Sequence, residues 1–219
     1  MKVAIYSDIV CPWCYVGEHR FRRAVEATGV RIEVAFRPFQ LNPDATTHPV
    51  PVMDYLRARF GPQADAAHDN VARMATREGL PFLAREQLVV STFDAHRLLA
   101  LALQSYGASV QAKLMRELFQ AHFAGRANCA DAETLVTLAQ QAGMDSAPVR
   151  AMLRSDEGKQ ELQTELAHAI GLGVHAVPTF VFADRFALQG AQPVETFARV
   201  LEQLAGESAG DGDGRTTVH

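Results

Sequence analysis

Two cysteines three residues apart are the residues best suited to chemistry, and they stand near the start of the chain in Cys11-Pro12-Trp13-Cys14. They follow a strand-like apolar run and precede a helical pattern, a context typical of thiol-disulfide exchange. A disulfide needs Cβ atoms within about 3.5–4.5 Å, whereas positions i and i+3 of a regular helix lie about 5–6 Å apart. We therefore expect Cys11 at the mouth of the helix, where the backbone can adjust. Pro12 suits the first helical position because its missing N–H needs no partner there.

We expect the two thiols to have different roles in the exchange reaction. The thiolate is the attacking species, and helix N-termini lower the pKa of a cysteine from about 8.5 to ~3.5–7.5. We expect Cys11 to be the exposed, attacking thiol and Cys14 to be the half-buried thiol that resolves the mixed disulfide. A stabilised thiolate hardly speeds the attack, because intrinsic nucleophilicity falls with the pKa, but it makes the couple more oxidising and the sulfur a better leaving group.

A zinc site is the main alternative for this cysteine pair. It would need two further ligands, usually from a second CxxC or an HxxxH. Cys129 stands alone, and the eight histidines show no such spacing. We therefore expect no metal and no bound cofactor, and we interpret Cys129 as a small buried residue just before a helix.

Composition narrows the class of partner and the compartment. The formal net charge of −4 comes without a basic stripe, which argues against a nucleic-acid partner. No apolar run approaches the ~20 residues of a membrane span, and the first ten residues lack a signal-peptide pattern. We expect a cytoplasmic protein, in which a permanent structural disulfide is disfavoured.

The flanking patterns predict a β-α-β unit at the start of the chain. Residues 2–7 alternate as a strand, residues 13–28 have helical spacing closed by Gly29, and residues 30–36 alternate again. Two strands joined by a helix are expected to lie parallel through a right-handed crossover. From about 50 to 170 we find only helical signals, including a capping-box pattern at Ser91-Thr92-Phe93-Asp94.

The β pattern returns late in the chain. Residues 179–183 and 185–190 flank a short turn at Asp184 and predict a hairpin, and a last amphipathic helix is expected from 193 to 204. With 48% hydrophobic residues, the chain can bury a sizeable core. This order predicts an α/β, thioredoxin-like fold with a large helical insertion.

The expected domains follow from that order. A discontinuous thioredoxin-like domain takes residues 1–45 and 172–205. A helical insertion takes 46–171, and its last helix returns to the thioredoxin core. The tail, 206–219, is rich in small polar residues and predicts disorder.

Four blocks resemble the signature segments of DsbA-like oxidoreductases of FrnE type. They appear in the right order and span roughly residues 1–204: 11–17, 37–43, 94–98 and 173–180. The same superfamily includes kappa-class glutathione transferases and 2-hydroxychromene-2-carboxylate isomerases, which typically carry serine at the position of Cys11. One branch of FrnE-type proteins has an additional C-terminal cysteine pair, which this chain lacks.

The resemblance implies a cis peptide bond at Val177-Pro178, facing the cysteine pair. Such a bond would let the backbone groups of Val177 pair with an extended substrate. From position alone, Pro178 is a residue that starts a strand without donating to the ladder. We therefore expect catalysis by Cys11, Cys14 and Pro178, with substrate contacts from Pro12, Trp13, Phe39, His175 and Val177.

Several candidates keep two interpretations. Trp13 either shields the thiols or stacks on substrate. Phe39 and Asn42 either line the cleft or shape a turn. His96 fits a hydrogen-bonded core residue better than a base, and Asp94 fits a helix cap.

His175 lies near Pro178 in sequence and could approach the thiols, where a protonated imidazole would favour the thiolate.

We predict a thiol-disulfide oxidoreductase acting on disulfide-containing proteins or low-molecular-weight thiols. The alternative is a glutathione-dependent transferase or isomerase, and a third class is a non-enzymatic binding module. Glutathione as a co-substrate stays open. The insertion offers enough apolar surface for a homodimer, but helices packing their own core explain that surface equally well.

Overall fold

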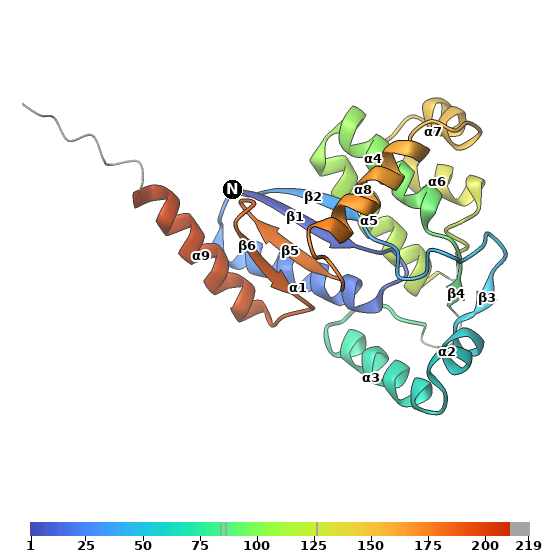
Figure 1. The fold of residues 1–219 in the computed structure, drawn as a ribbon. Helices are drawn as coiled ribbons and strands as arrows, with labels where there is room; N and C mark the ends of the chain where they lie inside the picture. The colour runs from blue at the N-terminus through green and yellow to red at the C-terminus, as the bar shows by residue number, and fades with distance from the viewer. Residues whose placement is uncertain (84, 86, 126, 211–219) are drawn as a thin grey trace, which may run out of the picture.

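The N-terminal β-α-β unit is present in the computed structural model, which describes residues 1–210 apart from 84, 86 and 126 (Figure 1). Strand β1 (Lys2–Ser7) leads into α1 (Pro12–Thr28), and β2 (Glu33–Pro38) lies parallel to β1. The predicted strand over 30–36 therefore starts too early. Its partner β1 begins only at Lys2, which pairs with Glu33, so residues 30–32 have no ladder to join.

The predicted hairpin is confirmed and completes one mixed sheet. Strand β5 (Thr179–Phe182) runs antiparallel to β1, and β6 (Phe186–Gln189) runs antiparallel to β5, in the order β2-β1-β5-β6. Ala183 and Asp184 have φ of 50° and 55°, and two positive φ angles give the tight turn that twisted hairpins favour. Segments from the two ends of the chain thus form the predicted thioredoxin-like fold.

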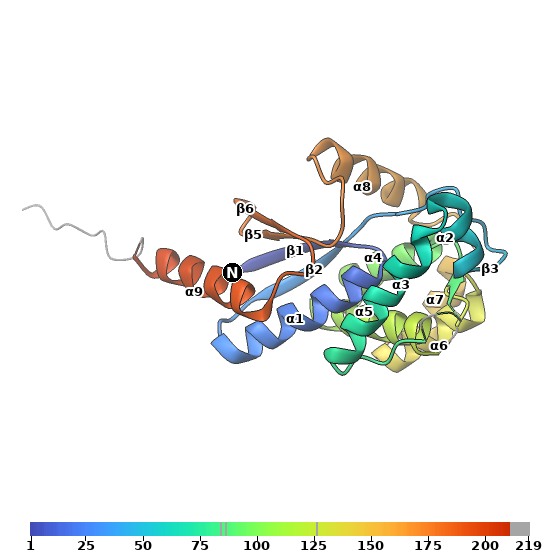
Figure 2. The ribbon, with the colours of Figure 1, turned by 90° about the horizontal axis from the view of Figure 1, so that it is seen from below.

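Helices cover both faces of this sheet (Figure 2). Helices α1 and α9 (Val194–Gly210) lie on one face, and α8 (Lys159–Gly171) lies over the other. The core under α1 and α9 is aromatic, with ring centroids 4.7 to 6.0 Å apart among Phe21, Phe180, Phe182 and Phe197. Such ring pairs add about 0.5–1.5 kcal/mol each beyond area burial.

The last helix is longer than predicted. The expected end at 204 and disorder from 206 are wrong for residues 206–210, because α9 continues to Gly210. Gln203 Nε2 donates to Glu207 Oε1 at 3.1 Å, a pair four residues apart that supports a further turn. The remainder of the predicted tail, 211–219, lies outside the described residues.

The insertion consists mainly of helices and adds two short strands. Its helices are α2 (Val52–Phe60), α3 (Gln63–Arg77), α4 (Phe93–Tyr106), α5 (Ala108–Phe123), α6 (Ala132–Ala142) and α7 (Ser146–Leu153). Strands β3 (Val50–Pro51) and β4 (Leu88–Val89) pair antiparallel, which corrects the prediction of helices alone. Two-residue strands are too short to show a period. None of the helices in the described ranges is long and apolar enough to span a bilayer.

The predicted capping box before α4 is absent. Thr92 occupies the N-cap position, but its side chain makes no capping hydrogen bond to the helix backbone, and Asp94 accepts a bond from Arg97 at 2.7 Å instead. Arg97 is only 2% exposed and donates to the carbonyls of Met152, Ser155 and Glu157. A buried arginine competes for Asp94 and joins α4 to the segment between α7 and α8.

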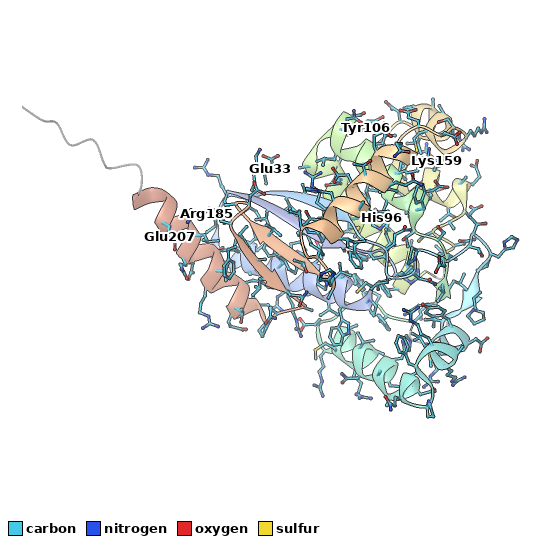
Figure 3. The ribbon with its side chains drawn as sticks, in the orientation of Figure 1. Glu33, His96, Tyr106, Lys159, Arg185 and Glu207 are labelled. Carbon is cyan, nitrogen blue, oxygen red and sulfur yellow. The ribbon has the colours of Figure 1, made fainter. Side chains whose placement is uncertain are left out.

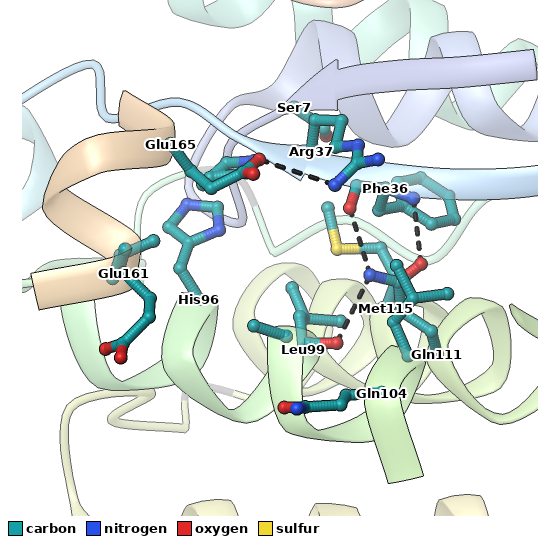
Figure 4. A pocket seen from close by; sticks show the side chains of 14 residues that line it. Ser7, Phe36, Arg37, His96, Leu99, Gln104, Gln111, Met115, Glu161 and Glu165 are labelled. Carbon is teal, nitrogen blue, oxygen red and sulfur yellow. Dashed lines mark hydrogen bonds and ion pairs between the residues drawn. The ribbon is translucent and has the colours of Figure 1, made fainter. Parts of the chain in front are cut away.

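The outer edge of the sheet is closed by a side chain from the insertion (Figure 4). The Phe36 N–H on edge strand β2 donates to Gln111 Oε1 at 2.8 Å, and Gln111 Nε2 donates to the Phe36 carbonyl at 2.9 Å. The same amide donates to the Leu99 carbonyl at 3.2 Å. Because an uncovered edge offers unpaired backbone groups, Gln111 seals β2 and fixes α5 against the sheet.

Candidate redox site

Cys11 and Cys14 lie at the start of α1 as the spacing predicted. Cys11 is the N-cap residue with extended backbone (φ −86°, ψ 111°), and Pro12 follows in the first turn. The Cys14 N–H donates to the Cys11 carbonyl at 3.0 Å, and the Cys11 N–H donates to the Asp8 carbonyl at 3.1 Å. Both thiols are free, and they are near enough to hydrogen-bond one another.

The predictions that Cys11 is exposed and that Cys14 is half-buried are both wrong. Cys11 is 3% exposed and Cys14 is 1% exposed. The Cys11 thiol donates to the Val177 carbonyl at 3.7 Å, so the 177–178 segment lies over the sulfur. Trp13, between the cysteines, is 37% exposed. The surface of the site is therefore formed by Trp13 and the segment at Val177, with the sulfurs beneath.

The surroundings of Cys14 hold its thiol in the protonated form. Burial raises the pKa of the Cys14 thiol well above its usual range, and its hydrogen bond with Cys11 and the charge on Cys11 raise it further. Bonds from the Ser7 side chain and the Asp8 backbone act in the opposite direction and are weaker. Cys14 thus keeps its proton at neutral pH, and a thiolate on Cys11 reinforces this.

Pro178 packs directly on the first turns of α1. The Val177-Pro178 peptide bond is cis, and Pro178 is buried. A Cβ at Gly17 would lie 2.9 Å from Pro178 Cγ and 3.4 Å from the Ala191 Cα. Only glycine therefore allows the helix that carries the cysteines to approach the proline this closely.

Gly17→Ala should move the start of α1 away from Pro178. Overpacking costs about 1–3 kcal/mol, while replacing a helical glycine returns about 1 kcal/mol, so we expect a net loss of up to about 2 kcal/mol. Thiol exchange should slow because Pro178 and Val177 move relative to Cys11. The matched control is Gly206→Ala on α9, where no atom lies within 4 Å. Equal exchange rates in the two variants, measured by stopped flow, would contradict the close approach.

A buried acid beneath the site was not predicted. Asp8 is fully buried; its Oδ2 accepts from the Leu41 N–H at 2.8 Å, and its Oδ1 lies 3.3 Å from His96 Nε2. His96 Nε2 is also 3.0 Å from the Phe39 carbonyl, and the residue lies where α4 meets the sheet (Figure 3). His96 is thus the hydrogen-bonded core residue that was predicted. The available signal for Asp8 was an acidic residue in an otherwise apolar stretch before the cysteines.

The remaining candidates, Phe39, Asn42 and His175, lie in three different surroundings. Phe39 packs on the cluster of Tyr6, Ala169 and Val174 under α8, so it shapes the loop after β2. Asn42 lines a cavity beside Pro12. His175 is exposed, and no hydrogen bond joins it to either thiol among the residues that the structure describes.

Within the described residues, neither a metal cluster nor a second reactive thiol accompanies the pair. In the described part of the chain no three His, Cys, Asp or Glu residues are arranged to hold a metal ion. Cys129 has no exposed surface, and burial raises its pKa to about 12. The prediction of a small buried residue at Cys129 is confirmed.

Two cavities flank the site. One, of about 320 Å³, lies behind Ser7 and His96 between β2, α4, α5 and α8 (Figure 4); Arg37 pairs with Glu165 at its wall at 3.4 Å. The other, of about 230 Å³, begins at Pro12 and reaches His122 on α5. Val10 and Pro12, the residues on either side of Cys11 in sequence, line the second cavity, whereas neither cysteine does.

His122 should make stability fall with acid. Burial lowers its pKa to about 4, against about 6.5 in an unfolded chain. As pH falls from 6.5 toward 4, the unfolded state takes up a proton that the folded state does not, so about 3 kcal/mol of stability is lost. Urea unfolding at pH 7 and pH 4.5 should show a smaller loss for His122→Phe than for the wild type. Identical losses would contradict the buried neutral imidazole.

Comparison with known proteins identifies the family of this chain. Residues 2–202 match the DSBA-like thioredoxin domain. The chain is 26% identical over 206 residues to the uncharacterized protein YwbO of Bacillus subtilis, covering 92% of this chain and 96% of that protein.

Two solved structures have the same fold as this chain. A probable DsbA oxidoreductase from Streptomyces coelicolor superposes with a TM-score of 0.85 at 37% identity, covering 100% of this chain and 93% of that one. The cytosolic disulfide reductase DsbM from Pseudomonas aeruginosa shares the fold, with a TM-score of 0.68 at 19% identity over 94% of this chain and 99% of that one; it has also been solved with GSH. From the domain match and the Streptomyces relative, the chain belongs to the DSBA-like thioredoxin domain family.

Proposed function

We propose that this protein is a thiol-disulfide oxidoreductase that exchanges disulfides with protein or small-thiol substrates through Cys11 and Cys14. The observation that carries the proposal is the asymmetric pair at the mouth of α1. Cys11 has its sulfur under the Val177 carbonyl, and Cys14 is held protonated one helical turn deeper.

The steps follow from that asymmetry. The Cys11 thiolate attacks one sulfur of a substrate disulfide, forming a Cys11–substrate disulfide and releasing the other substrate sulfur as a thiolate, which takes up a proton. Cys14 then loses its proton to solvent and attacks the Cys11 sulfur, and the second substrate sulfur leaves as a thiolate that takes up a proton. The substrate disulfide is reduced to two thiols, and the two cysteine thiols are oxidised to one disulfide.

The same steps run backwards when the substrate is a dithiol. The direction is set by the reduction potential of the partner thiols, and a monothiol such as glutathione is a candidate for restoring the reduced pair. The structure of DsbM with GSH supports a small thiol in this role. DsbM is described as a cytosolic disulfide reductase. A compartment rich in reduced thiols would favour the reductive direction for this protein as well.

The test compares three proteins in three assays. Wild type, Cys11→Ser and Cys14→Ser are assayed for insulin reduction, for turnover of glutathione disulfide and for conjugation of glutathione to an aromatic electrophile. The proposal expects the first two activities only in the wild type. Conjugation retained in both variants, with no disulfide turnover by the wild type, would replace it with a glutathione transferase.

A further inference from the structure

The cavity of about 320 Å³ extends from the end of β1 to the surface between α4 and α8 (Figure 4). Its inner wall includes Ser7 and His96, which are only 1% and 3% exposed. Its outer wall includes Gln104 on α4 and Glu161 and Glu165 on α8, and these three residues are exposed. The proposed exchange steps use none of these side chains, so the role of the cavity is open.

The buried position of Cys14 leaves its proton without a direct path to water. Cys14 must lose that proton before it attacks the Cys11 sulfur, because the thiolate is the nucleophile. Yet Cys14 is 1% exposed and lines neither of the cavities that flank the site. During this step the substrate is still joined to Cys11 and adds further cover. The proton therefore needs a neighbouring group that carries it to water.

Ser7 joins the Cys14 thiol to the 320 Å³ cavity. It lines the cavity, and its side chain hydrogen-bonds the Cys14 sulfur and lowers the pKa of that thiol, the effect of a hydroxyl that donates to the thiolate. A hydroxyl has one hydrogen to donate and two lone pairs that accept. Ser7 can therefore accept the proton of Cys14 while it gives its own hydrogen to a water in the cavity, and it then donates to the new thiolate.

His96 is placed to receive the proton inside the cavity. Its Nε2 lies 3.3 Å from Asp8 Oδ1 and 3.0 Å from the Phe39 carbonyl. Both oxygens accept hydrogen bonds, so the neutral ring carries its hydrogen on Nε2 and leaves a lone pair on Nδ1. Nδ1 has no hydrogen-bond partner among the described residues, and the ring lines the cavity. A base oriented by a third group is the arrangement that activates nucleophiles.

We infer that Ser7 relays the proton of Cys14 into this cavity, where a water passes it to Nδ1 of His96. The inference rests on the proposed function and adds two residues that act in its resolving step. A cavity of about 320 Å³ has room for several waters. Ser7 Oγ and His96 Nδ1 offer such a water two polar partners, which a buried water needs.

The bonds and protons balance across the step. The Cys14 S–H bond breaks as Ser7 Oγ takes up the proton, the Ser7 hydroxyl gives its hydrogen to the water, and that water protonates His96. The Cys14 thiolate forms a bond to the Cys11 sulfur as the bond from Cys11 to the substrate sulfur breaks. The proton on His96 then leaves through the cavity to bulk water at its exposed outer wall, where Glu165 lies.

The relay is tested by stopped flow with a chromogenic aryl disulfide, which releases one coloured thiolate in each step. The first phase depends on the disulfide concentration and reports attack by Cys11, and the second is independent of it and reports attack by Cys14. We expect Ser7→Ala to keep the first rate constant and to lower the second about tenfold or more, and Ser7→Thr, which retains a hydroxyl, to restore it. Equal second rate constants in wild type and Ser7→Ala would overturn the inference, whereas no first phase in the wild type would contradict the proposed function itself.

The acceptor is tested by His96→Gln, which keeps an N–H donor for Asp8 and Phe39 but has no base. His168→Gln, at an exposed position of α8, is the matched control. We expect the second rate constant to fall about tenfold or more in His96→Gln only, and added imidazole to accelerate that variant more than the wild type. Loss of folded protein would lower the amplitudes of both phases instead. An unchanged second rate constant in His96→Gln, or an equal fall in His168→Gln, would overturn the inference.

Discussion

Cys11→Ser is expected to lower the rate of reaction with disulfides by on the order of 10³-fold or more, because a serine hydroxyl is hardly ionised at neutral pH. Cys14→Ser should behave differently. It keeps the attacking sulfur under Val177 but loses the thiol that resolves the intermediate, so its first turnover proceeds and later ones stop. Rapid-quench assays with a chromogenic aryl disulfide separate the two outcomes.

The matched control for both variants is Cys129→Ala. Cys129 is fully buried, and burial raises its pKa to about 12, so we expect it to take no part in exchange at neutral pH. We expect wild-type rates for this variant. A loss in Cys129→Ala comparable to that in Cys11→Ser, at equal folded fraction, would show that the reactive thiol had been misassigned.

Arg97→Met is expected to destabilise the protein by about 3–5 kcal/mol, because the carbonyls of Met152, Ser155 and Glu157 lose the donor of a buried arginine and Asp94 loses its partner. For a chain of this size, that loss corresponds to a fall in Tm of roughly 6–20 °C. Arg97 lies in the insertion and its bonds go to Asp94 and to the carbonyls of Met152, Ser155 and Glu157. The part of the variant that remains folded should therefore keep the reactivity of Cys11.

Arg154→Met is the matched control, because Arg154 is exposed at the end of α7. Surface substitutions of this kind change stability by about ±0.5 kcal/mol at most. Urea unfolding of both variants gives the comparison. A midpoint for Arg97→Met equal to that of Arg154→Met would contradict the role of Arg97 in joining α4 to the connection between α7 and α8.

The sheet and the cysteine pair could be predicted because both depend on local patterns. Alternation over residues 2–7 and 179–183 survives in β1 and β5, and Pro12 after Cys11 marks the start of α1. Thioredoxin-like topology then followed from the order of the elements. The strand at 33–38 was placed too early because its start depends on a partner strand rather than on its own sequence.

What could not be predicted depends on contacts between distant segments. Cys11 is hydrogen-bonded to the distant Val177, and the pairing of Asp8 with His96 joins the residue that follows β1 to α4. The cavity at Pro12 brings Gln87 and His122 together from two parts of the insertion. The predicted capping box is absent for the same reason, because Asp94 accepts a hydrogen bond from Arg97 instead. Patterns within one segment carry no information on such neighbours.

The most direct test of the redox pair is to locate the trapped intermediate. Cys14→Ser is incubated with a peptide disulfide, alkylated in acid and digested, and the peptide adduct is mapped by mass spectrometry. The proposed function predicts one disulfide-linked adduct, on Cys11, that disappears in Cys11→Ser/Cys14→Ser. An adduct on Cys129, or no covalent adduct at all, would contradict it.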